Sequence, residues 1–166
     1  MSFSFEAKNE LCRLPVQKLC CARAEAYGIL LYCNTFSAGE VRIITGNPAL
    51  AGRLPKLFQR AFSIRFDRTP EAGETGKLVF QITDEAKIRR IVDLLGFSPE
   101  QNLALHINFG LLEEDCCRAS FLREVFFAGG SVTDPAKRYH LELATSHLQV
   151  SRELEVLLRE CGYPPK

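Results

Sequence analysis

Residues 20–36 of the chain read CCARAEAYGILLYCNTF, and residues 116–132 read CCRASFLREVFFAGGSV. Each stretch opens with two adjacent cysteines, continues as an apolar run of helical length, and closes on a small or turn-forming residue before a hydroxyl side chain. The second stretch begins 96 residues after the first. A pattern that recurs at a fixed offset indicates a duplicated structural unit. The two stretches therefore predict a pair of equivalent helices, one in each copy of a repeat.

The likeness continues downstream of both helices. Residues 40–45 (EVRIIT) and 139–145 (YHLELAT) alternate between apolar and polar side chains, which is typical of strands. Each of these strands precedes a helix. In the first copy Asn47 can cap that helix, and Pro48 suits its first position. Pro55 lies within the same helix and is expected to kink or break it.

The corresponding helix of the second copy has its own start and stop signals. Thr145 or Ser146 is the expected N-cap. Gly162 supplies a left-handed stop, with Pro164 beyond it. The apolar positions of this helix recur at helical spacing: Leu148, Leu154, Leu157 and Leu158.

The first copy contains a further segment that has no counterpart in the second. Residues 63–69 and 77–83 predict a hairpin across a turn that contains proline and glycine. Thr83 or Asp84 then opens another helix, which Gly96 ends. The first copy is therefore complete with this segment, whereas the second copy stops after its second helix.

These elements divide the chain into an N-terminal helical arm (1–19), a first repeat (20–115) and a partial second repeat (116–166). With a weak strand near Phe36, the first repeat is α-β-β-α-β-β-α, and the expected fold class is α+β. We expect the chain to be the N-terminal part of a longer protein. The apolar faces that a missing hairpin would cover are expected to lie against another copy of the chain, as in a homo-oligomer, or against a rearranged neighbour.

Composition narrows the classes of function. Hydrophobic residues make up 46% and charged residues 25% of the chain, which is ordinary for a globular protein and excludes a disordered or fibrous one. The longest apolar run is too short to cross a bilayer, and the first eleven residues do not read as a signal peptide. Seven cysteines occur without a C-x-x-C pair, so a reduced, cytoplasmic protein is expected. The net charge of +1 is far below that of a dedicated DNA-binding domain.

The duplication, with apolar helices that end in small residues, resembles the LAGLIDADG homing endonuclease fold. In that fold the two motif helices pack side by side on a pseudo-two-fold axis, and the paired sheets form a saddle over DNA. The amino-acid sequence is more similar still to that of the WhiA family of sporulation regulators. The matching stretches are residues 2–11, 20–28, 116–123, 127–135 and 139–142.

The resemblance implies a degenerate endonuclease-like domain followed by a C-terminal helix-turn-helix, which is absent from this chain and carries most of the DNA binding. It also implies a bacterial transcription regulator, cytoplasmic and associated with the nucleoid, that acts in sporulation in actinobacteria and in cell division elsewhere. The domain itself would position DNA or contact a partner protein, and the sequence leaves both roles open.

The resemblance also bears on catalysis. A LAGLIDADG nuclease places one carboxylate at the end of each motif helix, where the two acids share divalent metal ions that activate water. Alignment of the motif puts Cys33 and Gly129 at these positions. The nearest acids, Glu40 and Asp134, fall in turns or at strand starts. We therefore expect no enzyme activity, no cofactor and no bound metal; the alternative is an active, metal-dependent DNA endonuclease.

The small and sulfur-containing residues of the motif helices have two interpretations each. The four paired cysteines would suit zinc if they converged, but adjacent helical residues point about 100° apart, so packing is favoured. Gly28, Gly129 and Gly130 are the candidates for close helix–helix approach on the axis, and an ordinary helix stop is the other interpretation of the last two.

Basic residues define a candidate DNA-binding surface. Arg53, Lys56, Arg60, Arg65 and Arg68 cluster in the sequence, and other cations punctuate the strands. Cations on a saddle can contact phosphates, but acids lie among them, and a solvated surface is the favoured interpretation. The candidates for DNA contact are Arg42, Arg65, Arg68, Lys77, Lys137 and Arg138.

Overall fold

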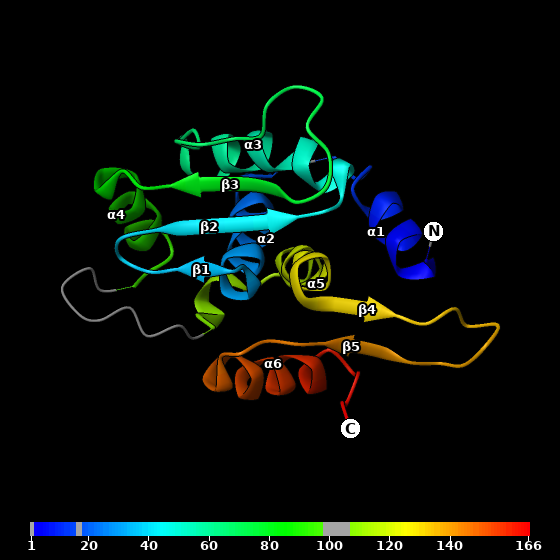
Figure 1. The fold of residues 1–166 in the computed structure, drawn as a ribbon. Helices are drawn as coiled ribbons and strands as arrows, with labels where there is room; N and C mark the ends of the chain where they lie inside the picture. The colour runs from blue at the N-terminus through cyan, green and yellow to red at the C-terminus, as the bar shows by residue number, and fades with distance from the viewer. Residues whose placement is uncertain (1, 16–17, 98–106) are drawn as a thin grey trace.

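The computed structural model describes residues 2–15, 18–97 and 107–166, and in these ranges it has six α-helices and two small sheets (Figure 1). In chain order the elements are α1 (Phe3–Leu11), α2 (Leu19–Tyr32), β1 (Thr35–Phe36), β2 (Val41–Thr45), α3 (Pro48–Phe62), β3 (Leu78–Ile82), α4 (Glu85–Leu94), a 3-10 turn (Phe109–Leu111), α5 (Asp115–Gly129), β4 (Gly130–Val132), β5 (Leu141–Leu143) and α6 (Leu148–Glu160). None of the helices in these ranges is both long and apolar enough to cross a membrane.

Local signals place the helices of the first repeat as predicted. The Asn47 side chain accepts hydrogen bonds from the amides of Ala49 (2.9 Å) and Leu50 (3.3 Å) at the start of α3. Asp84 caps α4 in the same way, with a 2.9 Å bond from the amide of Ala86. Gly96 has a φ of +79° just beyond α4, the left-handed conformation that a glycine stop supplies.

The predicted hairpin between residues 63–69 and 77–83 is wrong. β3 pairs instead with β2 along its whole length, from Val41 opposite Ile82 to Thr45 opposite Leu78, and residues 63–69 contribute one isolated bridge, between Arg68 and Gln81. The sheet order is β1-β2-β3, with antiparallel neighbours. Because β2 buries alternate side chains, it needs a partner strand with the same alternation, and β3 has it.

The expected break at Pro55 does not occur, since α3 runs as one helix from Pro48 to Phe62. The proline lies on the exposed face of the helix, where the carbonyl that it leaves unpaired is near solvent. On the opposite face Leu54, Leu57 and Phe58 are fully buried. Packing of this apolar face outweighs the loss of one backbone hydrogen bond.

The second repeat has the predicted order of helix, strands and helix. β4 and β5 pair antiparallel, and Gly162 adopts a φ of +91° after α6. The predicted N-cap of α6 is wrong by one or two positions: His147 occupies it, and the Thr145 hydroxyl accepts the His147 amide at 3.2 Å. Leu148, expected in the core, is 65% exposed.

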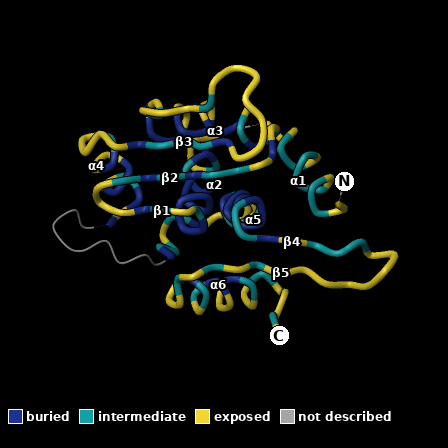
Figure 2. Tube along the Cα trace, in the orientation of Figure 1, coloured by how far each residue is buried: buried dark blue, intermediate teal, exposed yellow. Residues whose placement is uncertain are grey.

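The centre of the molecule is the pair formed by α2 and α5, which have the most extensive contact of any two elements. The three-stranded sheet lies on one side of this pair and the β4–β5 hairpin on the other (Figure 1). Figure 2 shows that burial concentrates in α2 and α5 and on the inner faces of α3 and the sheet. The fold is therefore α+β, with the two repeats joined through their motif helices.

Candidate functional site

The α2–α5 pair is close because Gly28 allows it. A Cβ atom at Gly28 would lie 2.7 Å from the backbone oxygen of Phe121 and 3.3 Å from the Cβ of Glu124. Real side chains do not tolerate the first distance, so the absence of a Cβ sets the helix separation here. Gly28 and Glu124 are equivalent positions of the two repeats, and the glycine of one makes room for the carboxyl of the other.

At the C-terminal end of α2 lies Cys33, which the sequence alignment of the motif predicts at the first acidic position. Its thiol donates to the carbonyl oxygens of Leu30 and Thr35, each at 3.2 Å. Burial raises the pKa of Cys33 to about 12, although the hydrogen bonds act in the opposite direction. The side chain is therefore a neutral thiol at physiological pH, and hard divalent cations prefer oxygen ligands to thiols.

At the C-terminal end of α5, Gly129 has no room for a side chain. A Cβ there would lie 2.5 Å from the backbone oxygen of Ala144 and 2.6 Å from the Tyr32 ring. Gly130 differs, because the three atoms nearest to a Cβ there all belong to Phe126 of its own helix. It is extended (φ −103°), and the chain enters β4 directly without a left-handed stop.

The acids nearest to this end of the pair have other partners. Glu40 forms an ion pair with Arg42 at 3.0 Å and accepts from the Gln81 amide at 2.9 Å. Asp134 accepts the Ala136 amide at 2.9 Å within its own turn. Among the described residues, carboxylates form no group of three or more that could hold a metal ion.

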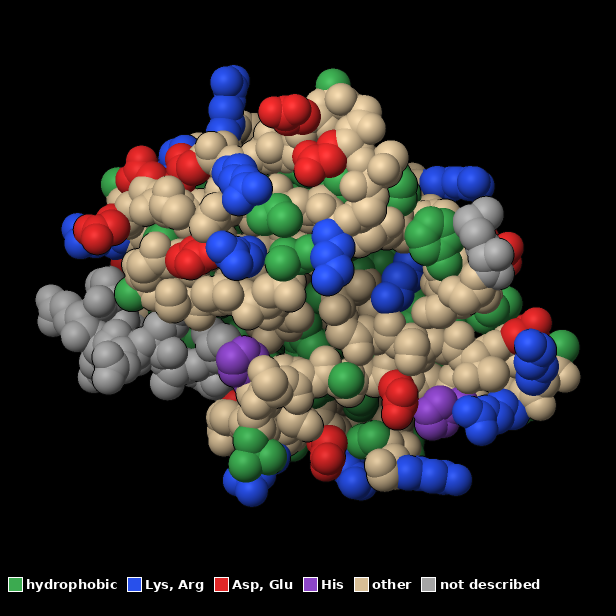
Figure 3. Space-filling model, viewed as in Figure 1, with side chains coloured by type: hydrophobic (Ala, Val, Ile, Leu, Met, Phe, Trp, Pro, Cys, Tyr) green, Lys and Arg blue, Asp and Glu red, His purple; other side chains and the backbone are tan. Residues whose placement is uncertain are grey.

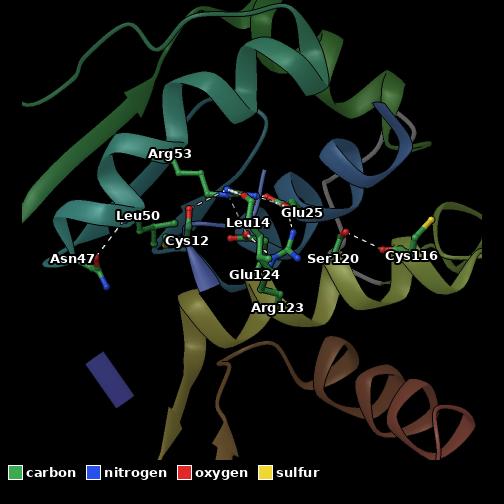
Figure 4. A network of polar contacts seen from close by, with 10 residues as sticks. All are labelled: Cys12, Leu14, Glu25, Asn47, Leu50, Arg53, Cys116, Ser120, Arg123 and Glu124. Atoms are coloured by element: carbon green, nitrogen blue, oxygen red, sulfur yellow. Dashed lines mark hydrogen bonds and ion pairs between the residues drawn. The ribbon is translucent and has the colours of Figure 1, made fainter. Parts of the chain in front are cut away.

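A buried network of charged side chains occupies the middle of the pair and was not predicted from the sequence (Figure 4). Arg53 reaches from α3 to Glu25 of α2, with its Nη2 2.7 Å from Oε1 and its Nε 3.2 Å from Oε2. Its Nη1 also donates to the carbonyl oxygens of Cys12, at 3.2 Å, and Leu14. One guanidinium thus joins α2, α3 and the segment that follows α1.

The α5 side of the network supplies Arg123 and Glu124. Arg123 contacts the Glu25 carboxylate, and its Nε lies 3.7 Å from Glu124 Oε1, the same separation as that between Arg53 Nε and Glu124. Both Glu124 oxygens are buried without a hydrogen bond. Burial and the neighbouring Glu25 raise the pKa of Glu124 well above its usual range, against the opposing effect of the two arginines.

The network corrects the interpretation of Arg53 as a surface cation, because this side chain is buried. One feature of the sequence could have indicated it. Glu25 and Glu124 each interrupt an apolar run within a helix. A buried carboxylate requires a partner, and a nearby arginine is the usual one.

The structure brings together only part of the predicted DNA-binding set. Arg42 lies directly opposite Gln81 in the sheet, and Arg68 bridges to the same glutamine from the other side. The three side chains therefore form a row across the solvent face of the sheet. Glu40 lies in this row as well, through its bonds to Arg42 and Gln81.

The other candidate cations are dispersed. Lys77 lies at the opposite end of β3, and Arg65 lines a hollow against α3. Lys137 and Arg138 are exposed in the turn between β4 and β5. Figure 3 shows that, on the side of the molecule seen in Figure 1, Lys and Arg side chains are interleaved with Asp and Glu.

The four paired cysteines converge at the N-terminal end of the α2–α5 pair. The sulfur atoms of Cys20, Cys21, Cys116 and Cys117 all lie within 4.8 Å of one another. Both cysteines of each pair therefore reach toward the partner helix, although adjacent helical positions point about 100° apart. Two residues 100° apart can straddle the line that faces the partner helix, each about 50° from it, and both then reach across.

The chain is similar to known proteins over nearly its whole length. The family model described as the WhiA LAGLIDADG-like domain matches residues 118–166. The chain is 32% identical to the probable cell division protein WhiA of Ruminiclostridium cellulolyticum, over 95% of the chain and 53% of the relative. It is 34% identical to the protein of the same name from Carboxydothermus hydrogenoformans, over 96% of the chain and 53% of the relative. The chain thus spans about half the length of these relatives.

Two solved structures share the fold. Full-length DUF199/WhiA from Thermatoga maritima superposes with a TM-score of 0.67 at 19% identity, over 96% of this chain and 50% of that one. The N-terminal LAGLIDADG domain of DUF199/WhiA gives a TM-score of 0.67 at 20% identity, over 96% of this chain and 75% of that one. At such identities the likeness shows the fold alone.

Proposed function

Because the chain belongs to the WhiA family over the LAGLIDADG-like part that it covers, we propose that it is a non-catalytic, endonuclease-like scaffold of a bacterial DNA-binding regulator. The curated relatives are named as probable cell division proteins. We propose that the regulated genes belong to cell division or, in actinobacteria, to sporulation. The scaffold positions DNA for a C-terminal helix-turn-helix that lies outside this chain. The regulator acts on the nucleoid in the cytoplasm.

The observation that carries this proposal is the pair of side chains at the C-terminal ends of α2 and α5. Cleavage by this fold requires two carboxylates that share divalent metal ions on the axis. Here one end holds a neutral, hydrogen-bonded thiol, and the other has no space for any side chain. A single substitution at either position would not rebuild the site.

Support for DNA positioning comes from the row of Arg42, Gln81 and Arg68 across the sheet. Guanidinium and amide groups in such a row suit phosphate oxygens, which fix the register of a protein on a duplex without reading its sequence. Glu40 reduces the positive charge of the row. The row would therefore make only an auxiliary contact with DNA, beside that of the helix-turn-helix.

A cleavage assay tests the loss of catalysis. Full-length protein is incubated with supercoiled plasmid and with cognate promoter DNA in Mg²⁺ and in Mn²⁺, beside an active LAGLIDADG enzyme. We expect no nicks or double-strand breaks. Cleavage that EDTA abolishes and that copurifies with the protein would support the alternative, an active endonuclease.

Salt-dependent binding tests the role of the row. In full-length protein, the double variant Arg42→Gln/Arg68→Gln should weaken DNA binding uniformly across sequences. It should also reduce the slope of log K against log salt by about 1 to 2, since each phosphate contact contributes about 0.9. Arg152→Gln, an exposed charge on α6, is the matched control and should leave the slope unchanged. An unchanged slope in the double variant would assign the domain to protein contact instead.

A further inference from the structure

The N-terminal end of the α2–α5 pair has the features of a metal centre. Four sulfur atoms from two segments 96 residues apart lie within 4.8 Å of one another. A tetrahedral zinc ion with bonds of about 2.3 Å holds its sulfur ligands about 3.8 Å apart. The cluster is thus within about 1 Å of the required size, a distance that rotation of the side chains can cover. We propose that Cys20, Cys21, Cys116 and Cys117 bind one tetrahedral zinc ion.

The arrangement of the thiols follows the internal symmetry of the fold. Cys20 and Cys116 are equivalent positions of the repeat, as are Cys21 and Cys117. Across the pair, the Cys21 thiol contacts that of Cys116, and the Cys117 thiol contacts that of Cys20. This cross-pairing places the pseudo-two-fold axis through the middle of the four sulfurs, where a single ion with four equivalent ligands would lie.

Packing alone does not account for the cluster. A free cysteine that serves only as a small apolar side chain is usually buried. Here Cys117 is buried, Cys21 and Cys116 are half-buried, and Cys20 is exposed. The cluster therefore lies at the surface with one side open, which gives an ion a route of entry. All four cysteines are free thiols, so none of them is occupied by a disulfide.

The cluster lies at the N-terminal ends of two helices, although burial and the neighbouring thiols raise the pKa of Cys21 and Cys117. Each cysteine pair lies in the first turn of its helix, and neither α2 nor α5 has a side-chain hydrogen bond at its N-cap. The positive ends of two helix dipoles therefore meet at the cluster. A zinc ion with four thiolates carries a net charge of −2, which both helix ends stabilise. Glu114, with its carboxylate 3.5 Å from the Cys116 sulfur, would move away on binding.

The size of the cluster distinguishes one ion from an iron–sulfur cluster. In the latter the four thiolates are divided among two or more iron atoms, so the set of four sulfurs spreads further than around a single ion. A zinc ion here would tie the first turn of one repeat to the first turn of the other. It would thereby fix the N-terminal end of the pair independently of the degenerate end, that is, the C-terminal end with Cys33 and Gly129.

Metal analysis of full-length protein, purified under reducing conditions, tests the proposal. Elemental mass spectrometry should show about one zinc per chain in the parent protein. The Cys117→Ser variant should lose the metal. Because that variant removes a buried thiol, the exposed Cys20→Ser serves as a second variant that should fold and bind zinc at least tenfold more weakly. Cys161→Ser, a free cysteine on α6 outside the cluster, should retain the full zinc content.

Cobalt provides an independent readout. Titration of metal-free, reduced protein with Co²⁺ should give the intense visible bands of tetrahedral thiolate coordination, and Zn²⁺ should displace them at one equivalent. Reduced protein that is purified without zinc and gives no such bands with Co²⁺ would overturn the proposal. Disulfides that re-form between the helices after reduction would also overturn it, as would stoichiometric iron in place of zinc.

Discussion

The two ends of the α2–α5 pair differ in how far they retain the symmetry of the repeat. At the N-terminal end, equivalent positions carry the same residue, and all four side chains meet. At the C-terminal end, the equivalent positions are Cys33 and Gly129, which share neither chemistry nor space. A ligand set works only when it is complete. The four thiols offer a complete ligand set at one end, which we propose binds zinc, whereas Cys33 and Gly129 supply no pair of carboxylates at the other end.

Between the two ends, the lost symmetry has a structural use. Gly28 and Glu124 are equivalent positions, and the absence of a side chain at the first allows the second to lie against it. The carboxyl group then joins Glu25, Arg53 and Arg123 in the interior. The middle of the pair thus depends on a glycine opposite a glutamate, an arrangement that a symmetric pair could not have.

The largest expected effect comes from removing Arg53, the charge that joins α3 to α2 and to the segment after α1 in this middle region. Arg53→Met leaves Glu25 with one cation and two backbone carbonyls without their donor. Breaking a buried ion pair from one side costs about 3–5 kcal/mol, and urea denaturation should show this loss. Lys56→Met, an exposed cation on the same helix, is the control. A loss below about 1 kcal/mol would show that the network does not hold these elements together.

The next effect addresses the degenerate end alone. Gly129→Asp restores the acidic residue type of the motif but forces a side chain against the Ala144 carbonyl and the Tyr32 ring. Overpacking of this kind costs about 3 kcal/mol, measurable as a lower midpoint of denaturation, and should yield no Mg²⁺-dependent cleavage. Gly39→Asp adds the same charge where a Cβ meets nothing within 4 Å, and should be nearly neutral. Equal effects of the two substitutions would refute the steric argument.

A smaller effect, opposite in sign, concerns Glu124. Its raised pKa means that the folded protein binds a proton more tightly than the unfolded chain. The free energy of unfolding should therefore fall as pH rises above about 4.5, until the pKa of the folded state is passed. Glu124→Gln should flatten this dependence and stabilise the protein at pH 7.

The control for this pH experiment is Glu155→Gln, which removes an exposed carboxyl of α6 and should leave the slope as it is. Denaturation midpoints between pH 5 and 8 give the comparison. A Glu124→Gln variant less stable than the parent protein at pH 7 would mean that the ionised carboxylate is favourable in the network.

The sequence predicted what local chemistry determines. The caps at Asn47 and Asp84 and the stops at Gly96 and Gly162 depend on a few neighbouring residues. The repeat predicted the paired helices because equivalent apolar runs can be compared directly. Such features need no knowledge of which segments meet in space.

What the sequence did not predict depends on distant segments. The β3 strand could pair with residues 63–69 or with β2, and only burial of a common face selects β2. Pro55 was expected to break α3 because the packing of the opposite face was not known. The charged network and the convergence of four thiols each join segments that no local pattern connects.

The effect smallest in stability, and most direct on the two ends, is thiol labelling. Cys33 and Cys20 lie at opposite ends of α2, one half-buried with a pKa raised to about 12 and the other exposed. Since only the thiolate reacts, the shift from 9 to about 12 slows alkylation of Cys33 about 1000-fold at neutral pH. In native full-length protein, iodoacetamide should therefore label Cys20 after metal chelation and leave Cys33 unlabelled until the chain unfolds. Cys33→Ser should change stability by less than about 1 kcal/mol, because it replaces one hydrogen-bond donor with another. Labelling of Cys33 as fast as that of Cys20, followed by mass spectrometry of peptides, would show that the degenerate end is open to solvent and would remove the contrast between the two ends.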